Sequence, residues 1–411
     1  MSATEQRQPL KSLDEALADL LGHAAPLGRT ETVSTFDADG RVLAGDVVAA
    51  LDVPAHDNSA MDGYAVRSAD WANAATVFQV NQRIAAGSSG TVLGPMSAAR
   101  IFTGAPVPAG ADTVVMQENC WTADAGCVCV AVKPEAGEWI RRRGEDVTAG
   151  RTVLSKGELL APESIGLAAS IGFDKLLVAS PVRLALFSTG DELVMPGDVA
   201  PGNMKPGAIY NSNRFFLRAL LQRLGCTVTD LGIVPDKLDA TKAALASASE
   251  SHDLVLTSGG VSVGEEDHIK PAVQALGQLN LWQIAIKPGK PFAYGKIAKA
   301  HFIGLPGNPV SSFVTFLLLV RPFIRKLQGA TVLAPESIAA CAHFNLARAD
   351  KRREFLRVKR NSAGGLDLFD NQSSGVLTSV VWADGLVDNP AGNSIVYGDL
   401  VQFIPFSSLM S

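Results

Sequence analysis

Two glycine-rich turns are the residues of this sequence best suited to binding a ligand through their backbone. One is Ser258-Gly259-Gly260-Val261-Ser262-Val263-Gly264, and the other is Gly304-Leu305-Pro306-Gly307-Asn308-Pro309. In the second turn, Asn308 suits a helix cap and Pro309 suits the first helical position, where free N–H groups and the helix dipole attract an anion. Each turn alone is more often only a turn, and neither matches the P-loop or dinucleotide-binding glycine motif. Together they predict contact with a negatively charged ligand.

Carboxylates follow successive apolar runs in the same part of the chain. They are Asp191 and Glu192, then Asp236, and then Glu265, Glu266 and Asp267. Hard carboxylate oxygens placed in this way suit Mg²⁺ that bridges a phosphate substrate. A helix cap is the alternative role for each acid taken singly.

Basic side chains accompany these turns. Lys287 and Lys290 lie in the segment KPGKP, in which prolines restrict the backbone, and a lysine there could hold an oxyanion as a point charge. Arg141, Arg142 and Arg143 form an uninterrupted run, and guanidinium groups are good partners for phosphate. A solvated surface is the alternative for both groups.

The elements that must position these residues are alternating strands and helices. Helical patterns, among them Asn213–Leu224 and a last one from about Pro309 to Leu327, alternate with apolar runs. The runs are Val182–Phe187, Thr227–Val234, Asp253–Thr257, Leu281–Ile286 and His301–Leu305. This alternation predicts a largely parallel sheet, whose ligands bind at the carboxyl ends of the strands. Short β-like runs before Val147 and after Ala334 predict separate β domains. A capping box at Ser12 and Glu15 predicts an amphipathic first helix.

Composition excludes several classes of protein. The 411 residues include 36 Lys and Arg and 41 Asp and Glu, so the net charge is −5, which is unfavourable for general nucleic-acid binding. The five cysteines argue against a disulfide framework. The segment Met1 to Lys11 is polar, and the longest apolar run, Phe313 to Val320, is far shorter than the roughly 20 residues of a membrane span. We therefore expect a cytoplasmic protein that binds neither membranes nor nucleic acid.

Seven motifs in order resemble those of the molybdopterin molybdenumtransferase (MoeA) family, to which the C-terminal portion of gephyrin belongs. They are DNSAMDGYA (57–65), TGAPVP (103–108), RRRGED (141–146), FSTGDE (187–192), TSGGVSVGE (257–265), KPGKP (287–291) and GLPGNP (304–309). The resemblance implies a multidomain fold of α/β and β domains. A linker domain would comprise residues 1–50 and 147–180, an inserted β-rich domain 51–146, a three-layer α/β molybdopterin-binding domain 181–330, and a C-terminal β-barrel 331–411.

The resemblance also implies a reaction. Molybdenum from molybdate would be inserted into adenylylated molybdopterin with the help of Mg²⁺, which releases AMP and forms molybdenum cofactor. No protein nucleophile is needed, because the dithiolene sulfurs of the substrate are the metal's ligands, so positioning and charge stabilisation would do most of the catalysis. The family's homodimers place the site between the α/β domain of one subunit and the β-rich domain of the other. A transient contact with the molybdopterin adenylyltransferase would follow.

Residue roles are carried over motif by motif. Catalytic roles fall on Asp62, Asp146, Glu192, Asp236, Asp267 and Lys287. Asp236 and Asp267 are the candidates for metal ligands or for polar groups on the molybdate side, with Glu192 nearby. Substrate binding falls on Thr103, Arg141, Arg142, Arg143, Thr189, Gly190, Ser258, Gly259, Gly260, Ser262, Lys290, Pro306, Gly307, Asn308 and Pro309. Asp62, Thr103 and Asp146 would reach in from the partner subunit. Asn211 stands where many relatives carry Asp, so no charge-dependent role is expected of it. The alternatives are the adenylylation step itself, or a gephyrin-like scaffold.

Overall fold

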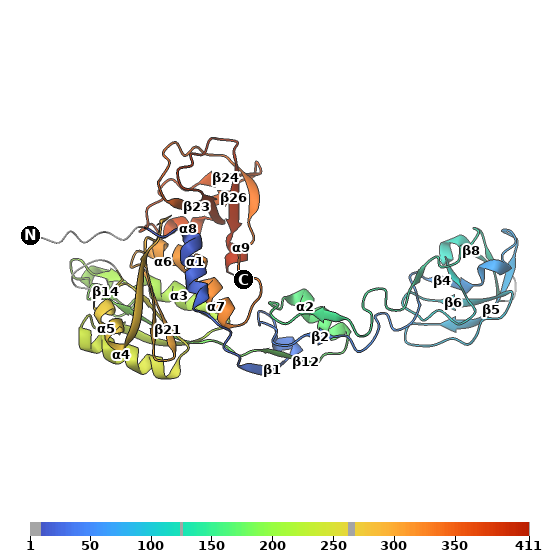
Figure 1. Cartoon of the computed structure of the whole chain (residues 1–411). Helices are drawn as coiled ribbons and strands as arrows, with labels where there is room; N and C mark the ends of the chain where they lie inside the picture. The colour runs from blue at the N-terminus through green and yellow to red at the C-terminus, as the bar shows by residue number, and fades with distance from the viewer. Residues whose placement is uncertain (1–9, 124–125, 262–267, 411) are drawn as a thin grey trace, which may run out of the picture.

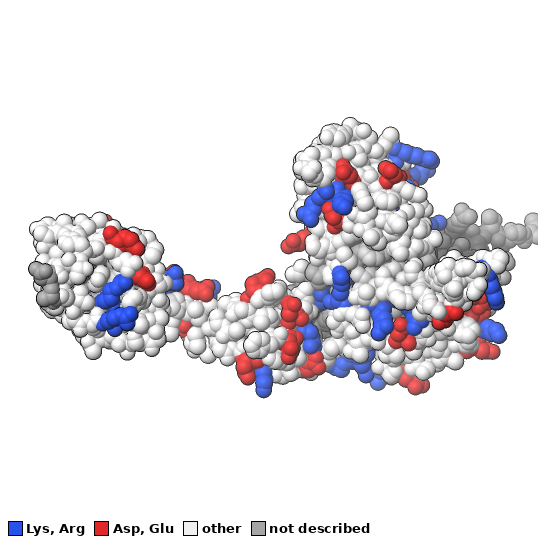
Figure 2. Space-filling view, turned by 180° about the vertical axis from the view of Figure 1, so that it is seen from behind, with Lys and Arg blue, Asp and Glu red and all other residues white. Residues whose placement is uncertain are grey.

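The computed structural model describes residues 10–123, 126–261 and 268–410. The molecule is elongated: a β-rich domain lies at one end, a slender middle segment follows, and an α/β domain with a small β domain stacked on it forms the other end (Figure 1). On the face shown in Figure 2, basic and acidic side chains are interspersed along the whole molecule and do not separate into a broad area of one sign.

A six-stranded sheet organises the α/β domain, in the order β16-β13-β17-β21-β20-β18. The strands β16 (Thr227–Val234), β13 (Arg183–Thr189), β17 (Leu254–Ser258) and β21 (Ala300–Leu305) are mutually parallel, as the alternating pattern predicts. Strand β13 lies between β16 and β17, and β17 is followed in the sheet by β21. The carboxyl ends of these strands therefore meet at one edge of the sheet.

The other two strands of this sheet differ from the expected parallel arrangement. Strand β18 (Gly277–Gln283) and strand β20 (Pro291–Ile297) pair antiparallel to each other, and β20 pairs antiparallel to β21. Strand β18 starts directly where helix α5 (Ile269–Leu276) ends, four residues before the predicted strand. The KPGKP segment lies in the connection between β18 and β20. Because Ala293 of β20 pairs with Gly304 near the end of β21, this connection lies at the same edge of the sheet as the carboxyl ends of the parallel strands.

Helices cover both faces of the sheet, as the three-layer prediction requires. One apolar core packs α3 (Ser212–Arg223) and the long C-terminal helix against the sheet, and a second core packs α4 (Leu238–Ser251) and α5 against the other face. The long helix is continuous from Pro309 to Leu327 and consists of α6 (Pro309–Thr315), a π-helical turn (Phe316–Val320) and α7 (Arg321–Leu327).

The first helix, α1 (Leu13–Gly22), begins with the predicted capping box, since Ser12 and Glu15 satisfy each other's backbone N–H groups. Its buried residues Leu13, Ala16 and Leu20 belong to the core of the α/β domain, and it packs on α7. The helix thus packs on the α/β domain, although the resemblance places residues 1–50 in the linker domain.

The middle segment is built from two pairs of antiparallel strands and one helix. Strand β1 (Thr30–Ser34) pairs with β12 (Lys175–Ala179), and β2 (Val47–Val48) pairs with β11 (Thr152–Leu154). Helix α2 (Pro162–Ser170) covers them, and a small core of its own includes Leu43, Leu160 and Val178.

The β-rich domain is an insertion whose entry and exit lie side by side, because Val53 and Val147 form a bridge. Its sheet has the order β7-β4-β6-β5-β9-β8. The strands are β4 (Gly63–Val66), β5 (Val77–Ile84), β6 (Ser97–Ile101), β7 (Thr113–Met116), β8 (Cys120–Ala123) and β9 (Cys127–Val130). The short pair β3 (Asn58–Ser59) and β10 (Ile140–Arg141) lies beside it.

The C-terminal domain is a closed β-barrel. The ring runs β23-β24-β22-β26-β25 and closes where β25 pairs with β23. Its strands are β22 (Ile338–Ala342), β23 (Arg353–Arg360), β24 (Gly365–Leu368), β25 (Gly385–Asn389) and β26 (Leu400–Pro405). Strand β19 (Ile286–Lys287), from the α/β domain, pairs with β23 and joins the two domains.

Candidate functional site

A cleft of about 770 Å³ lies at the carboxyl ends of the parallel strands, where the alternating pattern places the ligand site. Most of the α/β candidates line it: Thr189, Gly190, Glu192, Asp236, Ser258, Gly259, Gly260, Pro306, Gly307, Asn308 and Pro309. Ser262 and Asp267, as well as Glu265 and Glu266, lie outside the described residues. The two glycine-rich turns therefore lie side by side in the lining of one cavity.

The turns differ in how their backbone is held. Gly259 has a φ of +95° and Gly260 of +66°, values that favour glycine, and the N–H of Gly259 donates to the carbonyl of Leu305 at 3.0 Å. Pro309 starts α6 as predicted, and Asn308 occupies the N-cap position. The expected capping bond is absent, because the Asn308 side chain makes no cap hydrogen bond and is exposed beside the cleft.

Two carboxylates stand at the rim of the cleft. Glu192 folds back over Gly190, so that a Cβ on Gly190 would lie 2.6 Å from a carboxylate oxygen of Glu192. Gly190 has a φ of +138°, and a side chain there would push the carboxylate away. Asp236 lines the cleft just beyond the end of β16. Within the described part of the chain, no three His, Cys, Asp or Glu side chains lie close enough together to hold a metal ion.

Sequence reasoning missed several residues that line this cleft, and two of them connect separate segments of the chain. Asn213, in the first turn of α3, donates from Nδ2 to Ser258 Oγ and to the carbonyl of Gly307, each at 2.7 Å. Gly375 belongs to the barrel and lines the cleft, and the carbonyl of the preceding Ser374 accepts from Val310 N–H at 2.9 Å. An Asn-Ser-Asn triplet at a predicted helix start was the available signal for Asn213. For Gly375 no local pattern exists.

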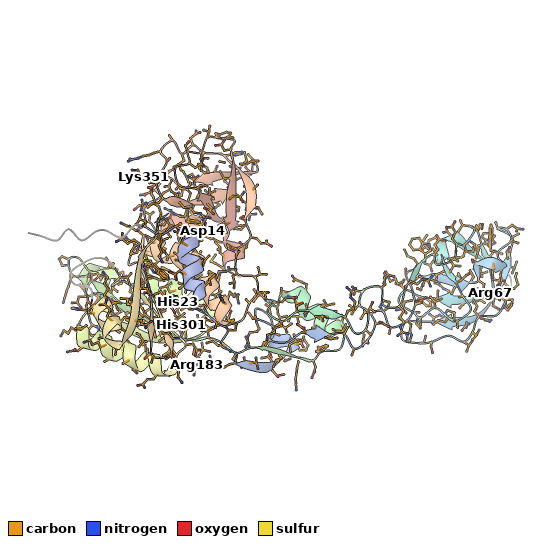
Figure 3. The ribbon with its side chains drawn as sticks, viewed as in Figure 1. Asp14, His23, Arg67, Arg183, His301 and Lys351 are labelled. Carbon is orange, nitrogen blue, oxygen red and sulfur yellow. The ribbon has the colours of Figure 1, made fainter. Side chains whose placement is uncertain are left out.

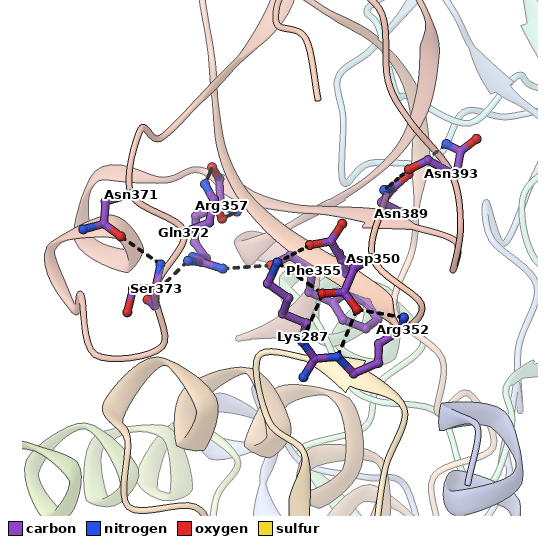
Figure 4. Close-up of polar contacts among 11 residues, drawn as sticks. Lys287, Asp350, Arg352, Phe355, Arg357, Asn371, Gln372, Ser373, Asn389 and Asn393 are labelled. Carbon is purple, nitrogen blue, oxygen red and sulfur yellow. Dashed lines mark hydrogen bonds and ion pairs between the residues drawn. The ribbon is translucent and has the colours of Figure 1, made fainter. Parts of the chain in front are cut away.

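Gln372 fixes the barrel loop that carries Gly375. Its Oε1 accepts from Arg357 N–H at 2.9 Å, and its Nε2 donates to the carbonyl of Arg357 at 3.1 Å (Figure 4). The same Nε2 also donates to the carbonyl of Phe369 at 2.8 Å. The Arg357 side chain is fully buried and donates to Ser379 Oγ and to the carbonyls of Phe355 and Ser373. Burial lowers the pKa of Arg357 to about 10. The loop is therefore held by a buried network of the barrel.

The two lysines of KPGKP are placed differently from the glycine-rich turns. Lys287 Nζ pairs with Glu354 at 2.8 Å and with Asp350 at 3.4 Å, both in the barrel domain (Figure 4). Hydrogen bonds from Arg352, opposed by partial burial, hold the pKa of Asp350 well below its usual range. Lys287 does not line the cleft, whereas Lys290 is exposed next to Pro291, which does. In this structure Lys287 thus binds carboxylates of the barrel domain, whereas the sequence predicted that it would bind an anionic substrate.

The candidates of the β-rich domain lie at the other end of the molecule (Figure 1). Asp62 accepts from the N–H and the hydroxyl of Thr103, both at 2.8 Å, and these bonds lower the pKa of Asp62. Arg142 pairs with Asp57 at 2.7 Å and Arg143 pairs with Asp52 at 2.6 Å. Within one chain, these residues do not reach the cleft.

Arg141 and Asp146 are the remaining predicted site residues of the β-rich domain. Arg141 ends strand β10, and the backbone N–H of Asp146 donates to the carbonyl of Val53 at the entry to the domain. Sequence reasoning missed Arg100, whose guanidinium lies over Phe102 and Tyr64 at 4.6 and 5.2 Å from their ring centres. Arg100 also donates to the carbonyl of Gly63 at 2.8 Å, which places a cation beside Asp62.

Comparison with known protein families shows the class to which this chain belongs. Residues 185–326 match the family described as "Probable molybdopterin binding domain", which is the α/β domain with its cleft. Residues 11–172 match "MoeA N-terminal region (domain I and II)", and residues 339–406 match "MoeA C-terminal region (domain IV)". The chain therefore belongs to the MoeA family, as its motifs indicate.

Relatives and solved structures agree with this assignment. The "Molybdopterin molybdenumtransferase" of Haemophilus influenzae is 39% identical over 406 residues, covering 97% of this chain and 99% of the relative. "Molybdopterin molybdenumtransferase 2" of Mycobacterium tuberculosis is 37% identical over 376 residues, covering 88% and 91%. A crystal structure of the molybdopterin biosynthesis MoeA protein of Pyrococcus horikoshii OT3 matches with a TM-score of 0.83 at 27% identity, covering 97% of this chain and 100% of that one. The multidomain fold is thereby confirmed.

Helix length bears on the expectation about membranes. Within residues 10–123, 126–261 and 268–410, none of the helices combines the length and the apolar character needed to cross a bilayer.

Proposed function

We propose that this protein is a molybdopterin molybdenumtransferase, which inserts molybdenum from molybdate into adenylylated molybdopterin, releases AMP and forms molybdenum cofactor. The observation that carries the proposal is the cleft formed by both glycine-rich turns in a domain of the molybdopterin-binding type. The full-length relatives named molybdopterin molybdenumtransferase support it.

The residues of the cleft suit two anionic substrates. The backbone N–H groups of the two turns and the ammonium group of Lys290 beside Pro291 provide donors and positive charge on one side. Thr189 and the exposed Asn308 amide offer hydrogen bonds that orient the ligand. Because the dithiolene sulfurs of the substrate become the ligands of molybdenum, the protein's task is to hold both substrates together and to offset their charge.

The donor set also suits Mg²⁺. Glu192 and Asp236 supply hard carboxylate oxygens at the rim of the cleft, the ligand type that Mg²⁺ prefers, while Asp267 lies outside the described residues. Bound there, Mg²⁺ would offset the negative charge of phosphate and molybdate. Asp236 and Glu192 are therefore the residues that we assign to the ion.

The site is completed by a second copy of the chain in this proposal. Asp62, Thr103, Asp146 and Arg141 to Arg143 lie too far along the molecule to reach the cleft of their own chain (Figure 1). The middle segment exposes apolar side chains that a partner would cover: Phe36 is 96% exposed, and Val48, Leu51 and Leu177 are also exposed. A two-fold dimer would place the β-rich domain of each subunit at the cleft of the other.

The reaction fixes the chemistry of one protein partner. Adenylylated molybdopterin must come from an enzyme that transfers AMP to molybdopterin. A transient contact with that adenylyltransferase would pass the labile substrate to this cleft.

One assay tests the function. Purified protein is incubated with adenylylated molybdopterin, molybdate and Mg²⁺, and both AMP and reconstitution of an apo molybdenum enzyme are measured. We expect stoichiometric AMP and active cofactor, with both lost in Asp236→Ala and both kept in Asp239→Ala, an exposed aspartate three residues away that does not line the cleft. Release of AMP without active cofactor would contradict insertion.

A mixing experiment tests the shared site separately. Asp62→Ala and Asp236→Ala subunits are exchanged after each has been shown to be folded and inactive. Random exchange gives about half heterodimers, each with one intact pocket of two, so about a quarter of wild-type activity should return. Verified exchange without any return of activity would place both residues in the pocket of one subunit.

A further inference from the structure

Asn213 joins the two glycine-rich turns to each other. It is 8% exposed and lies on α3, which follows neither β17 nor β21 directly in the chain. Its amide nitrogen has two hydrogens, and both are used: one bond goes to Ser258 Oγ and the other to the carbonyl of Gly307, each at 2.7 Å. One side chain therefore spans the gap between two loops of separate βα units.

Ser258 extends this connection. Its hydroxyl accepts from Asn213 and donates to the carbonyl of Pro306 at 3.3 Å, and the residue is 3% exposed. The hydroxyl hydrogen is thus directed at the second turn and is not offered to the cleft. Ser258 holds the two turns together, and the backbone of Gly259 and Gly260 is left to contact the ligand.

Pairing of the β-strands does not hold the two turns together. Strands β17 and β21 are in register only as far as Ser258 and Leu305. Among the described residues, one backbone bond, from Gly259 N–H to the carbonyl of Leu305, continues the pairing beyond that point. Past Leu305 the turns approach closely, since a Cβ on Gly307 would lie 3.9 Å from Gly259 Cα. The Asn213 bonds fix the loops in the region where strand pairing has ended.

We propose that Asn213 is a positioning residue of the cleft, which clamps the Ser258 turn to the Gly307 turn so that their backbone groups are preset for an anionic substrate. The inference rests on the proposed function for its substrate. Asn213 touches no substrate atom in this account, and it acts through Ser258 and Gly307. Loss of the clamp leaves the loops free to separate, so a substrate must reorder them on binding.

The test compares Asn213→Ala with Asn213→Asp and with a matched control. Asn213→Asp keeps the volume but places a carboxylate against the Gly307 carbonyl. Asn389 is the control, since it is 2% exposed in the barrel and exchanges two hydrogen bonds with Asn393. We expect KM for adenylylated molybdopterin to rise about 10- to 100-fold in both Asn213 variants, because two hydrogen bonds that order the site are lost. Asn389→Ala should lower Tm and leave KM unchanged.

A double-variant cycle separates the clamp from general packing. If Asn213 acts through Ser258, Ser258→Ala should add little to the rise in KM that Asn213→Ala causes. A wild-type KM in Asn213→Asp, or full additivity with Ser258→Ala, would overturn the proposal. Asn213→Asp carries the test if the alanine variant does not fold.

A binding measurement tests the role of Asn213 without requiring the proposed reaction. Molybdopterin is titrated against wild type and both Asn213 variants, and the Kd is followed by pterin fluorescence. Weaker binding to the variants supports the clamp even if wild type forms no cofactor, in which case the proposed function alone fails. If the wild type is active and the Asn213 variants bind molybdopterin with the same Kd as the wild type, the clamp is refuted and the proposed function stands.

Discussion

Arg29 binds both carboxylate oxygens of Asp253, with Nη1 to Oδ1 at 2.8 Å and Nη2 to Oδ2 at 2.5 Å. The same carboxylate accepts from the backbone N–H and the guanidinium of Arg183 at the start of β13. Burial opposes ionisation, but these bonds outweigh it and hold the pKa of Asp253 well below its usual range. Because Arg29 immediately precedes β1, this carboxylate ties the middle segment to the base of the α/β domain, opposite the cleft.

Asp253→Asn should therefore destabilise the protein. Both arginines are partly exposed, so solvent offsets part of the loss, and we expect the free energy of unfolding to fall by about 1–2 kcal/mol. The contribution of the lowered pKa is present at neutral pH and disappears as pH falls below the ordinary range of a carboxyl. Denaturant unfolding at pH 7 measures the effect. An unchanged midpoint would show that the three-residue cluster contributes no stability.

His301 should make the protein less stable in mild acid. The ring is 9% exposed, its Nδ1 lies 2.9 Å from the Tyr294 hydroxyl, and His23 stacks on the Tyr294 ring. His23 and His301 lie near each other in the α/β domain (Figure 3). Burial, together with Lys296 and His23, lowers the pKa of His301 to about 4, against the opposing effect of Asp253. The unfolded chain takes up the proton near pH 6.5 and the folded chain only near pH 4, so stability is lost as pH falls between these values.

The expected loss from this group between pH 7 and pH 5 is about 2 kcal/mol. His301→Gln removes the titrating group, so the difference in unfolding free energy between wild type and variant should shrink by that amount over the same range. A constant difference at all pH values would mean that the pKa of His301 is the same in both states.

Gly259→Ala should damage the cleft. The residue has a φ of +95°, and a Cβ would lie 3.1 Å from the carbonyl of Thr189. We expect about 1–2 kcal/mol lower stability and a raised KM, because the strained loop must shift. Gly166→Ala is the control: it lies within α2 with nothing within 4 Å of its Cβ, and alanine there should stabilise by up to about 1 kcal/mol. Thermal melting and steady-state kinetics distinguish the two.

Lys287→Ala should destabilise the contact between the α/β domain and the barrel. Glu354 is 2% exposed, and its second carboxylate oxygen has no hydrogen-bond partner among the described residues. Removal of Lys287 would leave a buried charge without its cation, at a cost of about 1–3 kcal/mol. Glu354→Gln added to Lys287→Ala should then recover part of that loss. If the double variant is less stable than Lys287→Ala, the pair is not coupled in this way.

The sequence predicted most of what is local and little of what joins distant segments. The parallel strands, the Ser12 capping box and the long helix from Pro309 follow from apolar runs and caps, and the structure confirms them. The sequence analysis predicted the start of β18 four residues too late, because a strand that begins where a helix ends has no loop before it, and it missed β20. Antiparallel pairing is also invisible in a single run of apolar residues.

Contacts across the chain explain the other differences. Lys287 looked like an anion ligand because its barrel partner Glu354 lies 67 positions further on. Asn213 looked like an ordinary helix start because its acceptor Gly307 lies 94 positions away. A charge or an amide has no assigned partner in the sequence, so only the fold decides whether it binds a ligand or another part of the protein.

The bridge between Val53 and Val147 has a consequence for how this chain tolerates rearrangement. Since the β-rich domain leaves and rejoins the chain at neighbouring points, it is attached like a side branch, and the remaining domains share few contacts with it (Figure 1). A short link from Val53 to Val147 could replace the whole branch without stretching the backbone on either side. Such a module can be exchanged as a unit, so the outer end can be replaced while the α/β domain and its cleft stay intact.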